Sequence, residues 1–117
     1  MSDQRRVLGA AGEDAVAEWY LEAGYEVLDR NWRCRDGELD LVVARDPVIV
    51  VCEVKTRTSE RFGAPVEAVT VPKQRRLRRL AVQWLADRSV RGELRFDVAS
   101  VRPGRAGLEV DVLEDAF

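Results

Sequence analysis

Three charged side chains, Asp40, Glu53 and Lys55, interrupt two apolar runs that read as neighbouring strands within residues 37–57. Only an Asp-Pro pair separates the runs, so the strands must form an antiparallel pair. Because strand side chains alternate with period two, Glu53 and Lys55 share one face. A lone charge is costly to bury, so these groups need partners, a metal ion or a function.

The composition limits the chemistry that these groups can do. The sequence contains no histidine, which excludes hydrolases with a histidine base and every histidine-ligated metal site. Carboxylate and lysine chemistry remains. Seventeen basic residues are arginine, and only Lys55 and Lys73 are lysine. The sequence otherwise prefers arginine. Lysine at position 55 therefore indicates that this position requires a compact, reorientable ammonium group.

Asp40 followed by Glu53-x-Lys55 resembles the restriction-endonuclease-like superfamily, also called the PD-(D/E)xK nucleases. Leu39 replaces the proline of that pattern, which is not a ligand. Motifs along nearly the whole chain are similar to the YraN family of small bacterial proteins, related in sequence to archaeal Holliday junction resolvases. These motifs are Gly12-Glu13-Asp14, Asn31-Trp32-Arg33, Gly37-Glu38-Leu39-Asp40, Phe62-Gly63, Lys73-Gln74-Arg75-Arg76 and Asp115-Ala116-Phe117.

Hydrophobic periodicity predicts an α/β fold in the order helix, three strands, helix, two strands. This is the restriction-endonuclease-like layout, a mixed central sheet flanked by helices. We expect helices over residues 8–23 and from about Pro72, and strands over 25–32, the two central runs, 94–101 and 108–112. Asp36-Gly37 and Pro103-Gly104 are the predicted turns, and residues 58–65 a polar loop. A strand-helix-strand crossover makes the strand at 94 parallel to the strand at 48. With 117 residues and 46% hydrophobic content, the chain is predicted to form a single domain over residues 1–117, and the resemblance implies that this domain is nuclease-like.

The resemblance implies that Asp40, Glu53 and Lys55 are catalytic and that Glu13, Asp40 and Glu53 bind Mg²⁺ or Mn²⁺. Carboxylates are the hard oxygen ligands that these ions prefer. Lys55 would orient or deprotonate the attacking water, or stabilise the transition state by its charge. The backbone carbonyl of Val54 is a further possible ligand. The alternatives are a buried structural cluster for the strand charges, and for Glu13 an interaction with the helix dipole.

A basic segment follows the central strands. Five of the seven residues from 73 to 79 are basic although the formal net charge is −2, so one face can attract phosphate. The alternatives are a solvated helix face for the cations and a capping role for Gln74. The predicted nucleic-acid-binding residues are Arg57, Lys73, Gln74, Arg75, Arg76 and Arg79.

The expected function is metal-dependent hydrolysis of nucleic acid by an endonuclease. DNA is favoured over RNA, branched or non-standard DNA is a candidate substrate, and a homodimer would allow two strands to be cut. The alternatives are a nucleic-acid-binding module that does not cleave and a protein-interaction domain that docks an acidic partner. No apolar run is long enough to cross a bilayer and no signal-like segment is present, which predicts a cytoplasmic protein without membrane contact.

Overall fold

A computed structural model describes residues 2–57 and 69–117, and its element order confirms the predicted one. The predicted loop at 58–65 and the Phe62-Gly63 motif lie outside the described residues. The elements are α1 (Ser2–Glu22), β1 (Glu26–Cys34), β2 (Gly37–Arg45), β3 (Val48–Thr56), α2 (Val71–Arg88), β4 (Glu93–Gly104) and β5 (Gly107–Leu113). The fold is mixed α/β.

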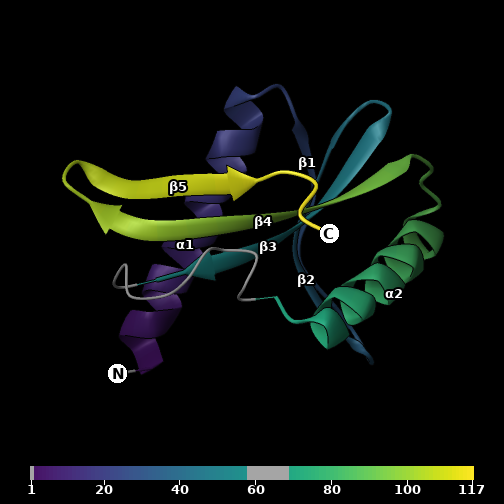
Figure 1. The fold of residues 1–117 in the computed structure, drawn as a ribbon, viewed down its shortest axis with the longest axis horizontal. Helices are drawn as coiled ribbons and strands as arrows, with labels where there is room; N and C mark the ends of the chain where they lie inside the picture. The colour runs from purple at the N-terminus through teal and green to yellow at the C-terminus, as the bar shows by residue number, and fades with distance from the viewer. Residues whose placement is uncertain (1, 58–68) are drawn as a thin grey trace.

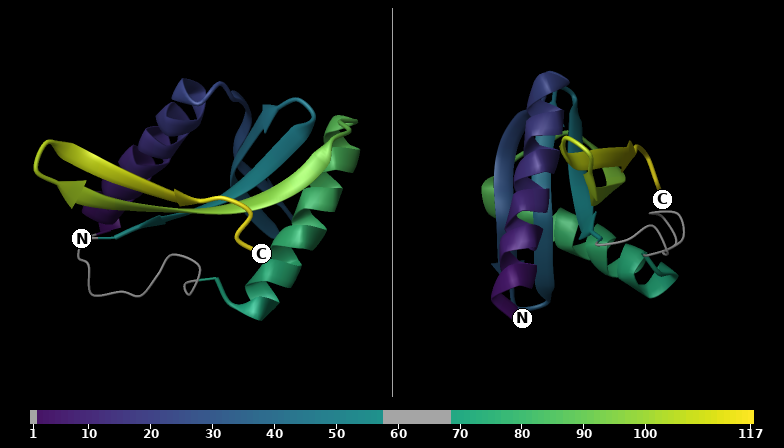
Figure 2. Two further views of the ribbon diagram at one scale, coloured as in Figure 1. Left: turned by 45° about the horizontal axis from the view of Figure 1, so that its top comes forward. Right: turned by 90° about the vertical axis from the view of Figure 1, so that its left-hand side faces the viewer.

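The five strands form one sheet in the order β1-β2-β3-β4-β5. All neighbours are antiparallel except β3 and β4, which run parallel from Val48 opposite Glu93 to Thr56 opposite Val101. The predicted crossover is therefore confirmed. Figures 1 and 2 show α1 on one face of this sheet and α2 on the other.

Each face of the sheet carries its own apolar core. Alternation along β3 sends Ile49 and Val51 to the α2 face, and Val50 and Cys52 to the α1 face. Both faces are therefore buried, which explains why this strand is apolar throughout. Trp84 is the largest buried side chain on the α2 side. The same alternation places Glu53 on the α2 face.

Two predicted turns were wrong by one or two residues. The β1–β2 turn consists of Arg35 and Asp36, and Gly37 begins β2 opposite Cys34 with a φ of 147°. Pro103 and Gly104 belong to β4, where they pair with Leu108 and Gly107. Pairing of β4 with β3 ends at Val101, so Pro103 has only one neighbouring strand, which is where a strand tolerates proline.

The helix boundaries follow capping chemistry. At α2, the Thr70 side chain accepts a hydrogen bond from the Lys73 amide at 3.3 Å, and Pro72 occupies an early position as predicted. Helix α1 begins at Ser2, six residues before the predicted start at Leu8. Its first residues lack apolar periodicity, so the pattern could not reveal them. Neither described helix is long and apolar enough to cross a membrane.

Candidate active site

Asp40 and Glu53 lie side by side where β2 and β3 stop pairing. The last pair of the ladder is Leu41 opposite Cys52, so Asp40 and Glu53 are the next residues outward on each strand. The Asp40 carboxylate accepts a hydrogen bond from the Val54 amide at 2.9 Å. The charge of Asp40 acts on the Glu53 carboxyl group, so the strands bring together two of the predicted site residues.

Glu53 is the most buried acid of this pair, with 7% of its surface exposed. Burial, and then the hydrogen bond and the charge of Asp40, raise the pKa of Glu53 to about 7. Two cations act in the opposite direction. The Lys73 ammonium lies 3.3 Å from the Glu53 Oε2 atom, and the charge of Lys55 also lowers the pKa of Glu53.

Lys55 is half-buried and follows Glu53 on the same face of β3. Burial lowers the pKa of Lys55, the Glu53 charge opposes that shift, and the positive charge of Lys73 adds to it. The neighbour of Lys55 on β4 is Ser100, a buried residue that the sequence analysis missed. An amine whose pKa is lowered by its surroundings is suited to proton transfer.

Glu13 approaches this pair from α1 but has a separate partner. Its Oε2 atom accepts a hydrogen bond from the Asn31 side-chain amide at 3.0 Å. Burial raises the pKa of Glu13, the Asn31 hydrogen bond lowers it, and the charge of Asp40 raises it further. Glu13 is therefore close enough to Asp40 to feel its charge, although its hydrogen bond is made elsewhere.

The carboxylates do not form a three-ligand metal group. Among residues 2–57 and 69–117, no three His, Cys, Asp or Glu side chains are placed to hold one ion, so the predicted set of Glu13, Asp40 and Glu53 is not assembled. The donor chemistry nevertheless fits Mg²⁺ or Mn²⁺, since Mg²⁺ retains several waters and binds through one or two carboxylates. A divalent cation would offset the repulsion between the neighbouring Asp40 and Glu53 carboxyl groups.

Gly12 lets α1 come close to the end of β3. A Cβ atom at this position would lie 2.1 Å from the Thr56 hydroxyl oxygen and 3.2 Å from the Thr56 Cβ atom. Only glycine fits this close approach without displacing the threonine. The contact fixes the helix beside the strand that carries Glu53 and positions Glu13, the next residue.

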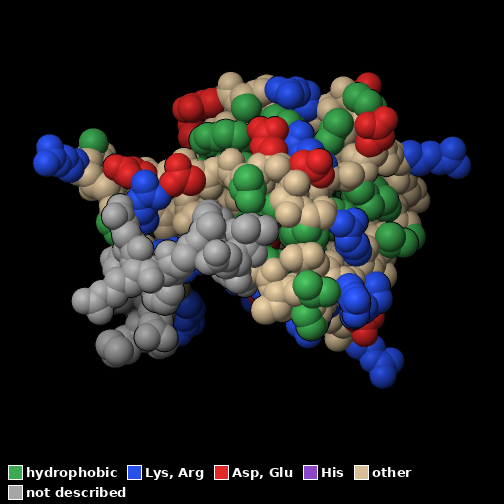
Figure 3. Space-filling model, in the orientation of Figure 1, with side chains coloured by type: hydrophobic (Ala, Val, Ile, Leu, Met, Phe, Trp, Pro, Cys, Tyr) green, Lys and Arg blue, Asp and Glu red, His purple; other side chains and the backbone are tan. Residues whose placement is uncertain are grey.

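The predicted nucleic-acid-binding residues have different environments. Arg75, Arg76 and Arg79 are exposed on α2, and Figure 3 shows Lys and Arg side chains over this part of the surface. Asp and Glu side chains gather instead along the β5 side. The Gln74 side chain donates to the Val69 carbonyl at 3.1 Å, a local contact that favours its structural alternative. Arg57 follows β3 and is half-buried.

A model of the family described as "Uncharacterised protein family UPF0102" matches residues 12–101, which include Gly12, the strand acids and both lysines. The chain belongs to this family. A UPF0102 protein of Frankia casuarinae is 49% identical over 112 residues, covering 94% of this chain and 95% of its own length. A UPF0102 protein of Mycobacterium sp. (strain JLS) is 53% identical over 105 residues, covering 86% and 77% of the two chains.

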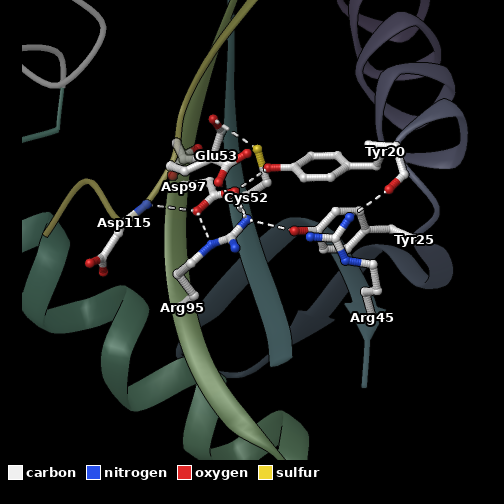
Figure 4. A network of polar contacts seen from close by, with 10 residues as sticks. Tyr20, Tyr25, Arg45, Cys52, Glu53, Arg95, Asp97 and Asp115 are labelled. Atoms are coloured by element: carbon white, nitrogen blue, oxygen red, sulfur yellow. Dashed lines mark hydrogen bonds and ion pairs between the residues drawn. The ribbon is translucent and has the colours of Figure 1, made fainter. Parts of the chain in front are cut away.

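The UPF0102 chain also contains a buried polar network that the sequence analysis missed (Figure 4). Asp97 is fully buried on the α1 face and accepts hydrogen bonds from the Tyr20 hydroxyl at 2.6 Å, from Arg95 and from the Asp115 amide. On the same α1 face, the Cys52 thiol lies 3.8 Å from the backbone carbonyl oxygen of Glu53. The sequence signal that could have revealed this network was Asp97 itself, an aspartate at a position of β4 where the alternation places the side chain inward.

Proposed function

We propose that this protein is a metal-dependent endonuclease that hydrolyses phosphodiester bonds of DNA in the cytoplasm, with branched or non-standard DNA as candidate substrates. Its fold would then be of the restriction-endonuclease-like type that the YraN and resolvase resemblance implies. The observation that carries the proposal is the convergence of Asp40, Glu53 and Lys55 at the end of one strand pair. An exposed basic helix on the same face of the sheet supports a polyanionic substrate.

In this proposal each group has a defined task. A bound Mg²⁺ or Mn²⁺ would supply stabilisation of the charge on the phosphoryl oxygens. Asp40 and Glu53 would hold the ion, with the Val54 carbonyl and Glu13 as further candidates, the latter through water. Lys55, with its lowered pKa, would orient the attacking water or accept its proton.

Incubation of linear, single-stranded and four-way-junction DNA with and without Mn²⁺ tests this function. Wild-type protein should cleave at least one of these substrates with Mn²⁺ and none of them without it. Asp40→Asn and Glu53→Gln should abolish cleavage while the circular dichroism spectrum is retained. Asp111→Asn, at an exposed acid on β5, is the matched control and should cleave normally. Full cleavage by both site variants would reject the assignment.

Cutting two DNA strands symmetrically would require a homodimer, because a single small domain presents one site. Sedimentation with and without DNA tests this part of the proposal. We expect a dimer in at least one of the two conditions. Monomers alone at the working concentration would contradict it.

A second candidate is a binding module on the same fold that does not cleave. It is favoured by the ion pair between Lys73 and Glu53 and by the absence of a three-ligand group in the described residues. This candidate predicts salt-dependent DNA binding with no metal-dependent product. Cleavage by wild-type protein in the screen above would exclude it.

The basic surface is tested by binding, independently of cleavage. Replacing Arg75, Arg76 and Arg79 with alanine should weaken DNA binding and reduce the salt slope by up to about 0.9 for each phosphate that is no longer neutralised. Arg105→Ala, at the β4–β5 turn, is the control and should leave the slope unchanged. An unchanged slope in the triple variant would show that this helix face does not contact phosphate.

A further inference from the structure

Both lysines of the chain converge on Glu53. The Lys73 ammonium lies 3.3 Å from its Oε2 atom, while Lys55 is close enough for its pKa to respond to the charges of both Glu53 and Lys73. The other 17 basic residues are arginine. The two compact ammonium groups are therefore gathered beside the paired carboxyls of the candidate metal site.

Lys73 lies at a position of α2 where a lysine is unfavourable for the helix. Thr70 caps α2, and Lys73 is the residue three places on, where the usual capping arrangement has Glu or Gln. A cation in the first turn of a helix opposes the helix dipole, and the first turn of α2 contains no acid to offset it. Local helix chemistry does not explain this lysine, whereas its contact with Glu53 does.

We propose that the Lys73 ammonium is a built-in substitute for the divalent ion, which neutralises Glu53 when no ion is bound and is displaced when one binds. This inference rests on the metal site of the proposed function. Glu53 is buried and pairs with Lys73, whose side chain is 36% exposed, so Lys73 has solvent into which it can move. Displacement by a smaller, doubly charged ion exchanges one favourable pair for a stronger one.

Mn²⁺ binding to the metal-free protein, without nucleic acid, tests the inference through the electron paramagnetic resonance signal of free Mn²⁺. Lys73→Met should bind Mn²⁺ roughly fivefold more tightly or better, the scale expected when a competing unit charge about 4 Å away is removed. Arg105→Met removes an exposed cation at the β4–β5 turn and should change affinity by less than about twofold. Lys73→Gln provides a second neutral replacement in case the methionine variant folds poorly.

The outcomes separate this inference from the function on which it rests. If wild-type protein binds Mn²⁺ through Glu53 but both Lys73 variants bind no more tightly, the substitute role is wrong and the metal site stands. If neither wild-type nor variant protein binds Mn²⁺, or if Glu53→Gln binds as well as wild type, the metal site fails and the inference fails with it. Tighter binding in both Lys73 variants, with the Mn²⁺ affinity of Arg105→Met unchanged, supports the inference.

Discussion

Replacing Glu53 with glutamine should remove a pH dependence of stability from the metal-free protein. The carboxyl has an ordinary pKa of 4.5 and a pKa of about 7 in the folded protein, because it is buried beside Asp40. Below pH 4.5 it is protonated in both states. Between pH 4.5 and about 7 the unfolded chain loses the proton first, so the stabilisation present at low pH is lost as pH rises through 7.

The size of the effect follows from the same two pKa values. At about 1.4 kcal/mol for each pKa unit, the rise corresponds to roughly 3 kcal/mol of unfolding free energy. Glutamine does not titrate, so the stability of Glu53→Gln relative to wild type should increase by about this amount between pH 4.5 and about pH 8. The charges of Lys73 and Lys55 lower the pKa of Glu53, but they do not offset the rise caused by burial and by Asp40.

Urea denaturation in EDTA, followed by tryptophan fluorescence, measures this difference because Trp84 is buried in the core. Glu109→Gln is the control, since this exposed acid pairs with Arg102 on the surface and its difference curve should be nearly flat. A flat curve for Glu53→Gln would refute the assignment of the raised pKa. Adding Mn²⁺ at about pH 8 should stabilise wild type, by about 2.7 kcal/mol at 100 times the dissociation constant, and leave Glu53→Gln unchanged.

Two further predictions concern the contacts that hold α1 against the sheet. Gly12→Ala should destabilise the protein by about 1–3 kcal/mol, because the new Cβ atom overlaps the Thr56 hydroxyl. Thr56→Ala should restore most of the stability in the double variant. Additive effects of the two substitutions on the unfolding free energy would contradict the clash. Asp97→Asn should reduce the unfolding free energy by about 3–5 kcal/mol, because Arg95 and Tyr20 lose a buried charged partner. Asp111→Asn, at an exposed acid, should reduce it by under about 1 kcal/mol. Equal destabilisation of the two variants in urea denaturation would show that the network around Asp97 is not stabilising.

The sequence was sufficient to predict the central sheet because β3 is apolar on both faces, a pattern that only a covered strand shows. The amphipathic helix α2 followed from its helical periodicity, and the parallel β3–β4 pair followed from the strand-helix-strand crossover. Turn positions were harder to predict from the sequence. Gly37 and Gly104 are typical turn residues, but here they lie at strand ends, since strand length depends on pairing partners that the local sequence does not specify.

The sequence was sufficient to predict that Asp40 and Glu53 are neighbours, because one strand pair places them, but it did not reveal the contacts between separate layers. Asp40 and Glu53 come together because the β2–β3 ladder fixes their register. Lys73, a predicted nucleic-acid-binding residue, pairs with Glu53 in the structure, a contact that depends on how α2 packs on the sheet. The available signal was Thr70-x-x-Lys73, with a cation where capping favours an acid or amide.

Anomalous diffraction from crystals of the wild-type protein soaked in Mn²⁺ tests whether Asp40 and Glu53 hold a divalent ion and whether that ion displaces Lys73. We expect an anomalous peak between the carboxylates of Asp40 and Glu53, with the Lys73 ammonium moved away from the Glu53 Oε2 atom. No peak at this position under saturating Mn²⁺, or a peak held by other residues while Lys73 remains paired with Glu53, would contradict this expectation.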